Sequence, residues 1–172
     1  NLQGGSPLGY GNHGWVNSTF DSAGNLRPEY MARLVPILDT ADELGMVVIL
    51  GYFYFGQDQV LEDETAVLNA VDTITNWIVD NGYRNIIIEI NNECNIRYDH
   101  EILQPDRVHE LIERVREKSG GTLLVSTSYG GGHIPHPNVA ASADFMLIHG
   151  NGVDEPERIA EMVAQTKEVE GY

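Results

Sequence analysis

A chain of 172 residues is long enough for one hydrophobic core and too short for two comfortable domains, and its 42% apolar content is ordinary for a globular protein. Its 10 basic and 26 acidic residues give a formal net charge of −16, which would repel nucleic acid and anionic membrane surfaces, so neither is expected as a partner. Cys94 is the only cysteine, which excludes an internal disulfide, and no apolar run approaches the roughly 20 residues that span a bilayer.

The first part of the chain is predicted to be a loop, then a helix, then a buried strand. Residues 1–25 are rich in Gly, Asn and Ser and read as one long loop, which in compact domains is typically functional or disordered. From Pro28 to Gly45 apolar residues recur at helical spacing, and Pro36 is expected to kink that helix. The continuous apolar run at 46–50 predicts a strand that is buried on both faces, as in a parallel sheet.

Residues 26–172 repeat this helix-then-strand unit. A second helix is predicted with Thr65 as its N-cap, and further helices are predicted to begin at Asp106 and Pro156; apolar residues again recur every three or four positions in each. Such alternation requires right-handed crossovers and a parallel sheet. An open doubly wound sheet and a closed (β/α)8 barrel are both compatible with this pattern, and since no Gly-x-Gly-x-x-Gly follows any strand, only the dinucleotide-binding version of the open sheet lacks support. The predicted strands are residues 46–50, 86–88, 123–125 and 145–148.

The carboxyl ends of these four strands carry aromatic, amide, carboxylate and imidazole groups. In parallel α/β folds the functional site lies at these ends. Tyr54 follows the first strand, Asn92 and Glu93 the second, Tyr129 the third and His149 the fourth. Any one strand end could be polar only because it meets solvent, but four together favour a site. Aromatic faces suit sugar rings, and amides and acids suit hydroxyl groups, so we expect a carbohydrate ligand.

The second strand ends in Glu89-Ile-Asn-Asn-Glu93, and here the chain resembles clan-A (β/α)8-barrel glycoside hydrolases, especially the family 5 cellulase-like enzymes. In that family strand four ends in Glu-Leu-x-Asn-Glu. The resemblance implies that Glu93 is the catalytic acid/base and that Asn92 bonds the hydroxyl next to the reacting carbon. It also implies that His149 corresponds to a strand-six histidine near the nucleophile. The four strands would then be strands three to six of a barrel.

The chain departs from the family pattern at several points. Cys94 stands where the family commonly has Pro, and the usual histidine near strand three is not evident beside Tyr54. The nucleophile, a Glu that ends strand seven, would lie beyond Tyr172. Glu89 cannot replace it, because four residues along one strand separate it from Glu93 by about 13 Å. We therefore expect residues 1–172 to form a single domain, a fragment of a catalytic barrel that is weak or inactive alone.

Three further residues are candidates for contacts with substrate. Trp15 and His13 lie in the opening loop, where Trp15 could be a stacking platform or a buried anchor. His133 and His136 have a spacing that some metal sites use, but no acidic partner completes a recognisable zinc pattern. We expect no metal and no cofactor, and a rigid loop with incidental histidines is the alternative to a sugar contact at His133.

The implied function is retaining hydrolysis of β-linked polysaccharide or oligosaccharide, and the resemblance implies a secreted or periplasmic protein. The rival function is a non-catalytic carbohydrate-binding or half-barrel scaffold protein, because an incomplete barrel leaves exposed sheet edges that favour self-association. A less favoured third reading is an open-sheet, metal-dependent hydrolase.

Overall fold

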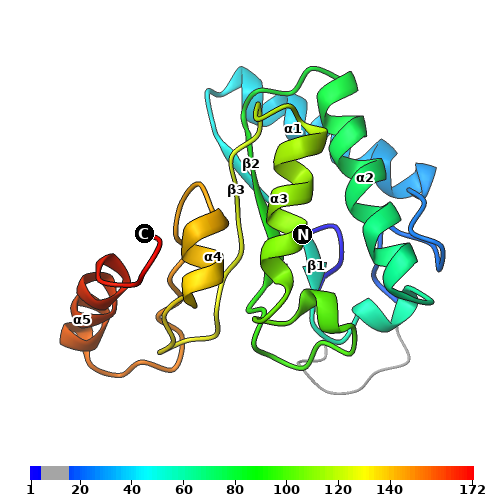
Figure 1. The fold of residues 1–172 in the computed structure, drawn as a ribbon. Helices are drawn as coiled ribbons and strands as arrows, with labels where there is room; N and C mark the ends of the chain where they lie inside the picture. The colour runs from blue at the N-terminus through cyan, green and yellow to red at the C-terminus, as the bar shows by residue number, and fades with distance from the viewer. Residues whose placement is uncertain (5–15) are drawn as a thin grey trace.

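The computed structural model describes residues 1–4 and 16–172 (Figure 1). His13 and Trp15 lie outside the described residues. From α1 to α4 the helices and strands alternate as the sequence predicts, and two short 3-10 helices lie in the connections. In chain order the elements are α1 (Pro28–Glu43), β1 (Val48–Tyr54), η1 (Asp58–Val60), α2 (Glu64–Asp80), β2 (Ile86–Asn92), η2 (Glu101–Leu103), α3 (Val108–Lys118), β3 (Val125–Ser126), α4 (Pro137–Ser142) and α5 (Pro156–Lys167).

The sheet is parallel, with the order β1-β2-β3, so the predicted parallel sheet is confirmed. Gly51 of β1 pairs with Glu89 of β2, and Glu89 pairs with Ser126 of β3. The predicted fourth strand at 145–148 is reduced to one parallel bridge between Ser128 and Leu147. That bridge still brings the residues that follow Leu147 beside the end of β3, and through it beside the end of β2.

Two details of the helices differ from the predictions. Thr65 is not the N-cap of α2; Asp63 is, and its Oδ1 accepts the backbone N–H of Ala66 at 2.8 Å. Aspartate is the stronger capping residue because its short carboxylate satisfies a helix N–H and complements the helix dipole. Pro36 lies inside α1 without ending it. The helix α3 begins at Val108, two residues after the predicted Asp106.

The two faces of the sheet are unequally covered. Leu50, Ile88 and Val125 are at most 3% exposed and belong to the same hydrophobic core as the apolar residues of α2 and α3. Figure 1 shows these two helices side by side along the sheet. On the opposite face, Ile49 and Leu124 are 51% and 52% exposed. An apolar face without a helical cover is what a segment of a barrel wall presents on its inner side.

The first residues of the chain lie along the free edge of β1. The backbone N–H groups of Leu2 and Gln3 donate to the carbonyls of Gly51 and Tyr52 at 2.7 and 3.2 Å. Gly51 permits this close approach, because a Cβ atom there would lie 2.0 Å from the side-chain oxygen of Asn1. Among the helices of the described residues, none is both long and apolar enough to span a membrane.

Candidate functional site

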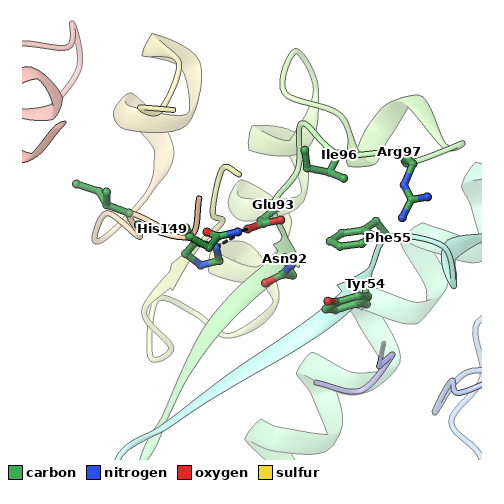
Figure 2. Close-up of a pocket in the computed structure, with 10 residues that line it drawn as sticks. Tyr54, Phe55, Asn92, Glu93, Ile96, Arg97 and His149 are labelled. Atoms are coloured by element: carbon green, nitrogen blue, oxygen red, sulfur yellow. Dashed lines mark hydrogen bonds and ion pairs between the residues drawn. The ribbon is translucent and has the colours of Figure 1, made fainter. Parts of the chain in front are cut away.

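A pocket of about 690 Å³ opens at the carboxyl ends of β1 and β2. It contains four of the residues that the sequence singles out, namely Tyr54, Asn92, Glu93 and His149. Figure 2 shows Glu93 and Asn92 between His149 on one side and the rings of Tyr54 and Phe55 on the other. The remaining lining residues are Phe55, Ile96, Arg97, Ile148, Gly150 and Asn151.

Glu93 is the centre of a hydrogen-bonded cluster in this pocket. Its side chain is only 11% exposed. The amide Nδ2 of Asn151 donates to its Oε1 at 2.9 Å, and His149 Nδ1 lies 3.0 Å from the same oxygen. Both contacts arrive from the segment that follows the Ser128–Leu147 bridge. The carboxylate of Glu93 is therefore held at one oxygen by two side chains that the fold brings from 56 and 58 residues away.

The backbone of Glu93 adopts an uncommon conformation. Its φ angle is +53°, in the left-handed region, which costs a non-glycine residue roughly 1–2 kcal/mol. The chain leaves β2 at this point, and two consecutive N–H groups turn toward the end of β3. Glu93 N–H donates to Ser128 Oγ and Cys94 N–H donates to the Ser128 carbonyl, both at 2.8 Å. Strain of this kind persists only where neighbouring contacts fix the backbone.

Aromatic rings form the wall opposite His149. The ring centroids of Tyr54 and Phe55 are 4.4 Å apart, and the guanidinium of Arg97 lies 5.5 Å from the Phe55 centroid. The backbone of Asn92 is fixed by a hydrogen bond, because its carbonyl accepts the Tyr98 hydroxyl at 2.7 Å. The pocket thus combines a flat apolar wall with carboxylate, amide and imidazole groups, which suits a ligand with apolar faces and hydroxyl edges.

Two of the predicted substrate-contacting residues do not line this pocket. Tyr129 is 2% exposed, and its hydroxyl accepts the backbone N–H of His136 at 3.2 Å, so it packs behind the strand end. His133 lines a separate pocket of about 510 Å³ between the β3–α4 connection and α5. Cys94 is nearly fully buried, and burial raises the pKa of its thiol to about 12, so it is not a thiolate nucleophile at neutral pH.

Glu89, which the sequence excluded as the nucleophile, is bonded within the sheet. It is 7% exposed, and its Oε1 accepts the hydroxyl of Ser128 at 2.5 Å. It therefore bonds to the neighbouring strand instead of entering the pocket. Among the lining residues in the described part of the chain, Glu93 is the only carboxylate. Residues 1–4 and 16–172 contain no group of three or more His, Cys, Asp or Glu side chains that could hold a metal ion.

The sequence placed Phe55 and Asn151 at the strand ends of the expected site without naming them as substrate contacts, and it did not identify Ile96 and Arg97 at all. Asn151 carried the clearest signal, since it stands two residues after His149 on the same polar strand end. Arg97 and Ile96 lie in the turn after β2, where Arg97 also has a positive φ of 39°. No periodicity fixes side-chain directions in such a turn.

The comparisons with known proteins bear on the fold. No protein-family model matches this chain, and no curated protein matches its sequence. A solved structure from Bacillus subtilis, ydhD, provisionally named a sporulation-specific glycosylase, has 14% identity, covers 88% of this chain and 56% of its own, and gives a TM-score of 0.57. A GH5-4 broad-specificity endoglucanase from an uncultured bovine rumen ciliate has 18% identity, covers 77% and 40%, and gives a TM-score of 0.48.

This chain therefore spans only 56% of the length of the glycosylase structure. At 14% identity that likeness concerns the fold alone. Together with the parallel β1-β2-β3 sheet, it confirms the expected α/β class and partial (β/α)8 barrel. It also confirms the resemblance in fold to the glycosidase barrels.

Proposed function

We propose that this chain carries the acid/base half of a glycoside hydrolase site, and that the enzyme hydrolyses β-linked polysaccharide or oligosaccharide with retention. The observation that carries the proposal is the setting of Glu93. It is a nearly buried carboxyl at a strand end, held by Asn151 and His149 and facing a wall of aromatic rings. Retention rests on the resemblance of Glu89-Ile-Asn-Asn-Glu93 to the family 5 pattern.

In the proposed reaction Glu93 first donates a proton to the glycosidic oxygen and later removes a proton from the attacking water. Asn151 donates its amide hydrogen bond to Oε1, and this favours acceptor character at that oxygen. The transferable proton would accordingly reside on Oε2. Asn92, beside Glu93 in the pocket, would bond a sugar hydroxyl, and Tyr54 and Phe55 would stack against a sugar ring. His13 and Trp15 remain proposed contacts from the opening loop.

A glycosidase needs a second carboxyl group about 5–5.5 Å from the first for retention. Because Glu93 is the only carboxylate among the described lining residues, we propose that the nucleophile comes from sequence beyond Tyr172 or from another chain. The same observation favours a second candidate, a non-catalytic carbohydrate-binding or half-barrel scaffold protein. That protein would use the same aromatic wall and amides without turnover.

The two candidates are separated by measuring hydrolysis and binding together. Sugar release from soluble β-glucans and mannans is compared for the wild type, Glu93→Gln and Glu161→Gln, the last a control whose side chain on α5 is 63% exposed. Calorimetry with β-linked oligosaccharides measures binding in parallel. Release that only Glu93→Gln abolishes supports the hydrolase. Binding without release, unaffected by Glu93→Gln, supports the binding protein, and neither binding nor release contradicts both.

A further inference from the structure

We propose that Ser128, oriented by its hydrogen bond to Glu89, is the positioning residue that holds Glu93 in its left-handed conformation and thereby directs its carboxylate into the pocket. The catalytic consequence rests on the function proposed above, but the structural claim does not. Neither residue lines the pocket, and both are buried, at 0% and 7% exposed.

The hydrogen bonds of Ser128 fix which groups donate and which accept. A hydroxyl has one proton and two lone pairs. The Ser128 proton goes to Glu89 Oε1 at 2.5 Å, so a lone pair of Oγ accepts the Glu93 N–H at 2.8 Å. The short bond to a carboxylate is charge-assisted and orients the hydroxyl. Because Glu89 takes the Ser128 proton, the Ser128 Oγ presents a lone pair to the Glu93 N–H and accepts its hydrogen bond.

Ser128 also meets the next peptide group. Its backbone carbonyl accepts the N–H of Cys94 at 2.8 Å. Two consecutive N–H groups at the end of β2 thus bond to one residue, one through its side chain and one through its backbone. Substitution of Ser128 by alanine removes the bond from the Glu93 N–H to the side chain. The bond from the Cys94 N–H to the Ser128 carbonyl remains and serves as an internal reference.

The conformation of Glu93 decides where its side chain points. A non-glycine residue that leaves the left-handed region changes the direction of its Cα–Cβ bond. The carboxylate of Glu93 would then leave Asn151 Nδ2 and His149 Nδ1, which now lie 2.9 and 3.0 Å away. Ser128 bridges to Leu147, two residues before His149. The residue that fixes the Glu93 backbone is thus also tied to the segment that holds its carboxylate.

Amide hydrogen exchange in Ser128→Ala tests the structural claim directly. We expect exchange of the Glu93 N–H to accelerate about tenfold or more, while the Cys94 N–H changes less than about twofold, since only the former loses its acceptor. The Asn151 side-chain amide signal should move toward its position in Glu93→Gly. Ser142→Ala, which removes a buried hydroxyl bonded to Glu113, is the matched control and should change neither. An unchanged Glu93 N–H in Ser128→Ala overturns the proposal.

A double-mutant cycle keeps the proposal testable if Ser128→Ala folds poorly. Glycine adopts the left-handed region without strain. Both backgrounds keep the backbone N–H of residue 93 and lose the same hydrogen bond, but only the wild type recovers backbone strain when residue 93 leaves the left-handed region. Ser128→Ala should therefore raise the unfolding equilibrium constant about threefold less in the wild type than in a Glu93→Gly background. Equal effects in the two backgrounds would show that Ser128 does not restrain Glu93, and would overturn the proposal.

Kinetics tests the catalytic consequence. In any hydrolysis that Glu93→Gln abolishes, Ser128→Ala should lower kcat about tenfold to a hundredfold with KM changed less than about twofold, because the substrate still meets the same pocket wall. Glu89→Gln, which keeps an oxygen acceptor for Ser128, should retain most of kcat. A rise in KM alone would contradict positioning. Absence of any Glu93-dependent hydrolysis would refute the proposed function instead, and the exchange result would still decide the role of Ser128.

Discussion

The left-handed backbone of Glu93 makes a prediction about stability that needs no substrate. Glu93→Ala and Glu93→Gly remove the same carboxylate and the same contacts with Asn151 and His149. The two variants differ in how well residue 93 tolerates a φ of +53° and in the entropy of the unfolded chain. Alanine keeps the strain of roughly 1–2 kcal/mol that any Cβ-bearing residue has there. Glycine loses that strain but costs about 0.4–1 kcal/mol more in unfolded-state entropy.

The midpoints of these two ranges leave Glu93→Gly more stable than Glu93→Ala by about 0.8 kcal/mol. Urea unfolding followed by circular dichroism measures it as a shift in midpoint at constant slope. The control is the same pair at Glu113, on α3, where the conformation is helical and the order should reverse, with alanine ahead by about 1 kcal/mol. If alanine is equal to or better than glycine at position 93, the backbone there is not strained and the argument for its restraint by Ser128 is wrong.

Three other predictions concern groups outside the site. Burial raises the pKa of Asp58, so its contribution to the free energy of unfolding is fully present below the unfolded-state pKa of about 3.9 and is lost as pH rises through the folded-state pKa. The free energy of unfolding of Asp58→Asn should therefore rise relative to that of the wild type from about pH 4 upward, and a difference independent of pH would contradict this. Gly24→Ala should destabilise the fold by at least about 1–3 kcal/mol in urea unfolding, because its Cβ would lie 2.2 Å from the Ala66 carbonyl, and a neutral effect would refute the close packing. Replacing the exposed Ile49 and Leu124 with serine should weaken any self-association in sedimentation velocity, and a wild type that is monomeric at every concentration would exclude association through this face.

The continuous apolar runs predicted where the strands lie, but the prediction that the 46–50 strand is buried on both faces is wrong, because Ile49 is 51% exposed. The β1 and β2 strands were found from these runs, and the helix from Pro156 was found from its apolar spacing. The run at 145–148 has a similar composition, yet it forms only the Ser128–Leu147 bridge. Strand propensity describes a residue that fits a pleated surface, and it does not ensure that a neighbouring strand is available for pairing.

The site was predictable in part because parallel strands end on the same side of a sheet. That rule placed Tyr54, Asn92, Glu93 and His149 together. It could not resolve which of two adjacent residues faces the pocket. Ser128 turns toward Glu89 and Glu93, so Tyr129, the next residue, points to the other side, since successive side chains of an extended chain alternate. The left-handed conformation of Glu93 could not be predicted from the sequence, because glutamate is not among the residue types that favour a positive φ.

The most direct test of the central claim uses a small external carboxylate in the role of the proposed nucleophile. Hydrolysis of an activated aryl β-glycoside and of a soluble β-glucan is measured with and without sodium formate, for the wild type and Glu93→Gln. We expect slow wild-type release that formate accelerates. We further expect that Glu93→Gln lowers release from the β-glucan, whose leaving group needs protonation, by about 100-fold or more, and release from the aryl glycoside far less. Equal rates for the wild type and Glu93→Gln on the β-glucan, with formate present, would contradict the role of Glu93 as the acid.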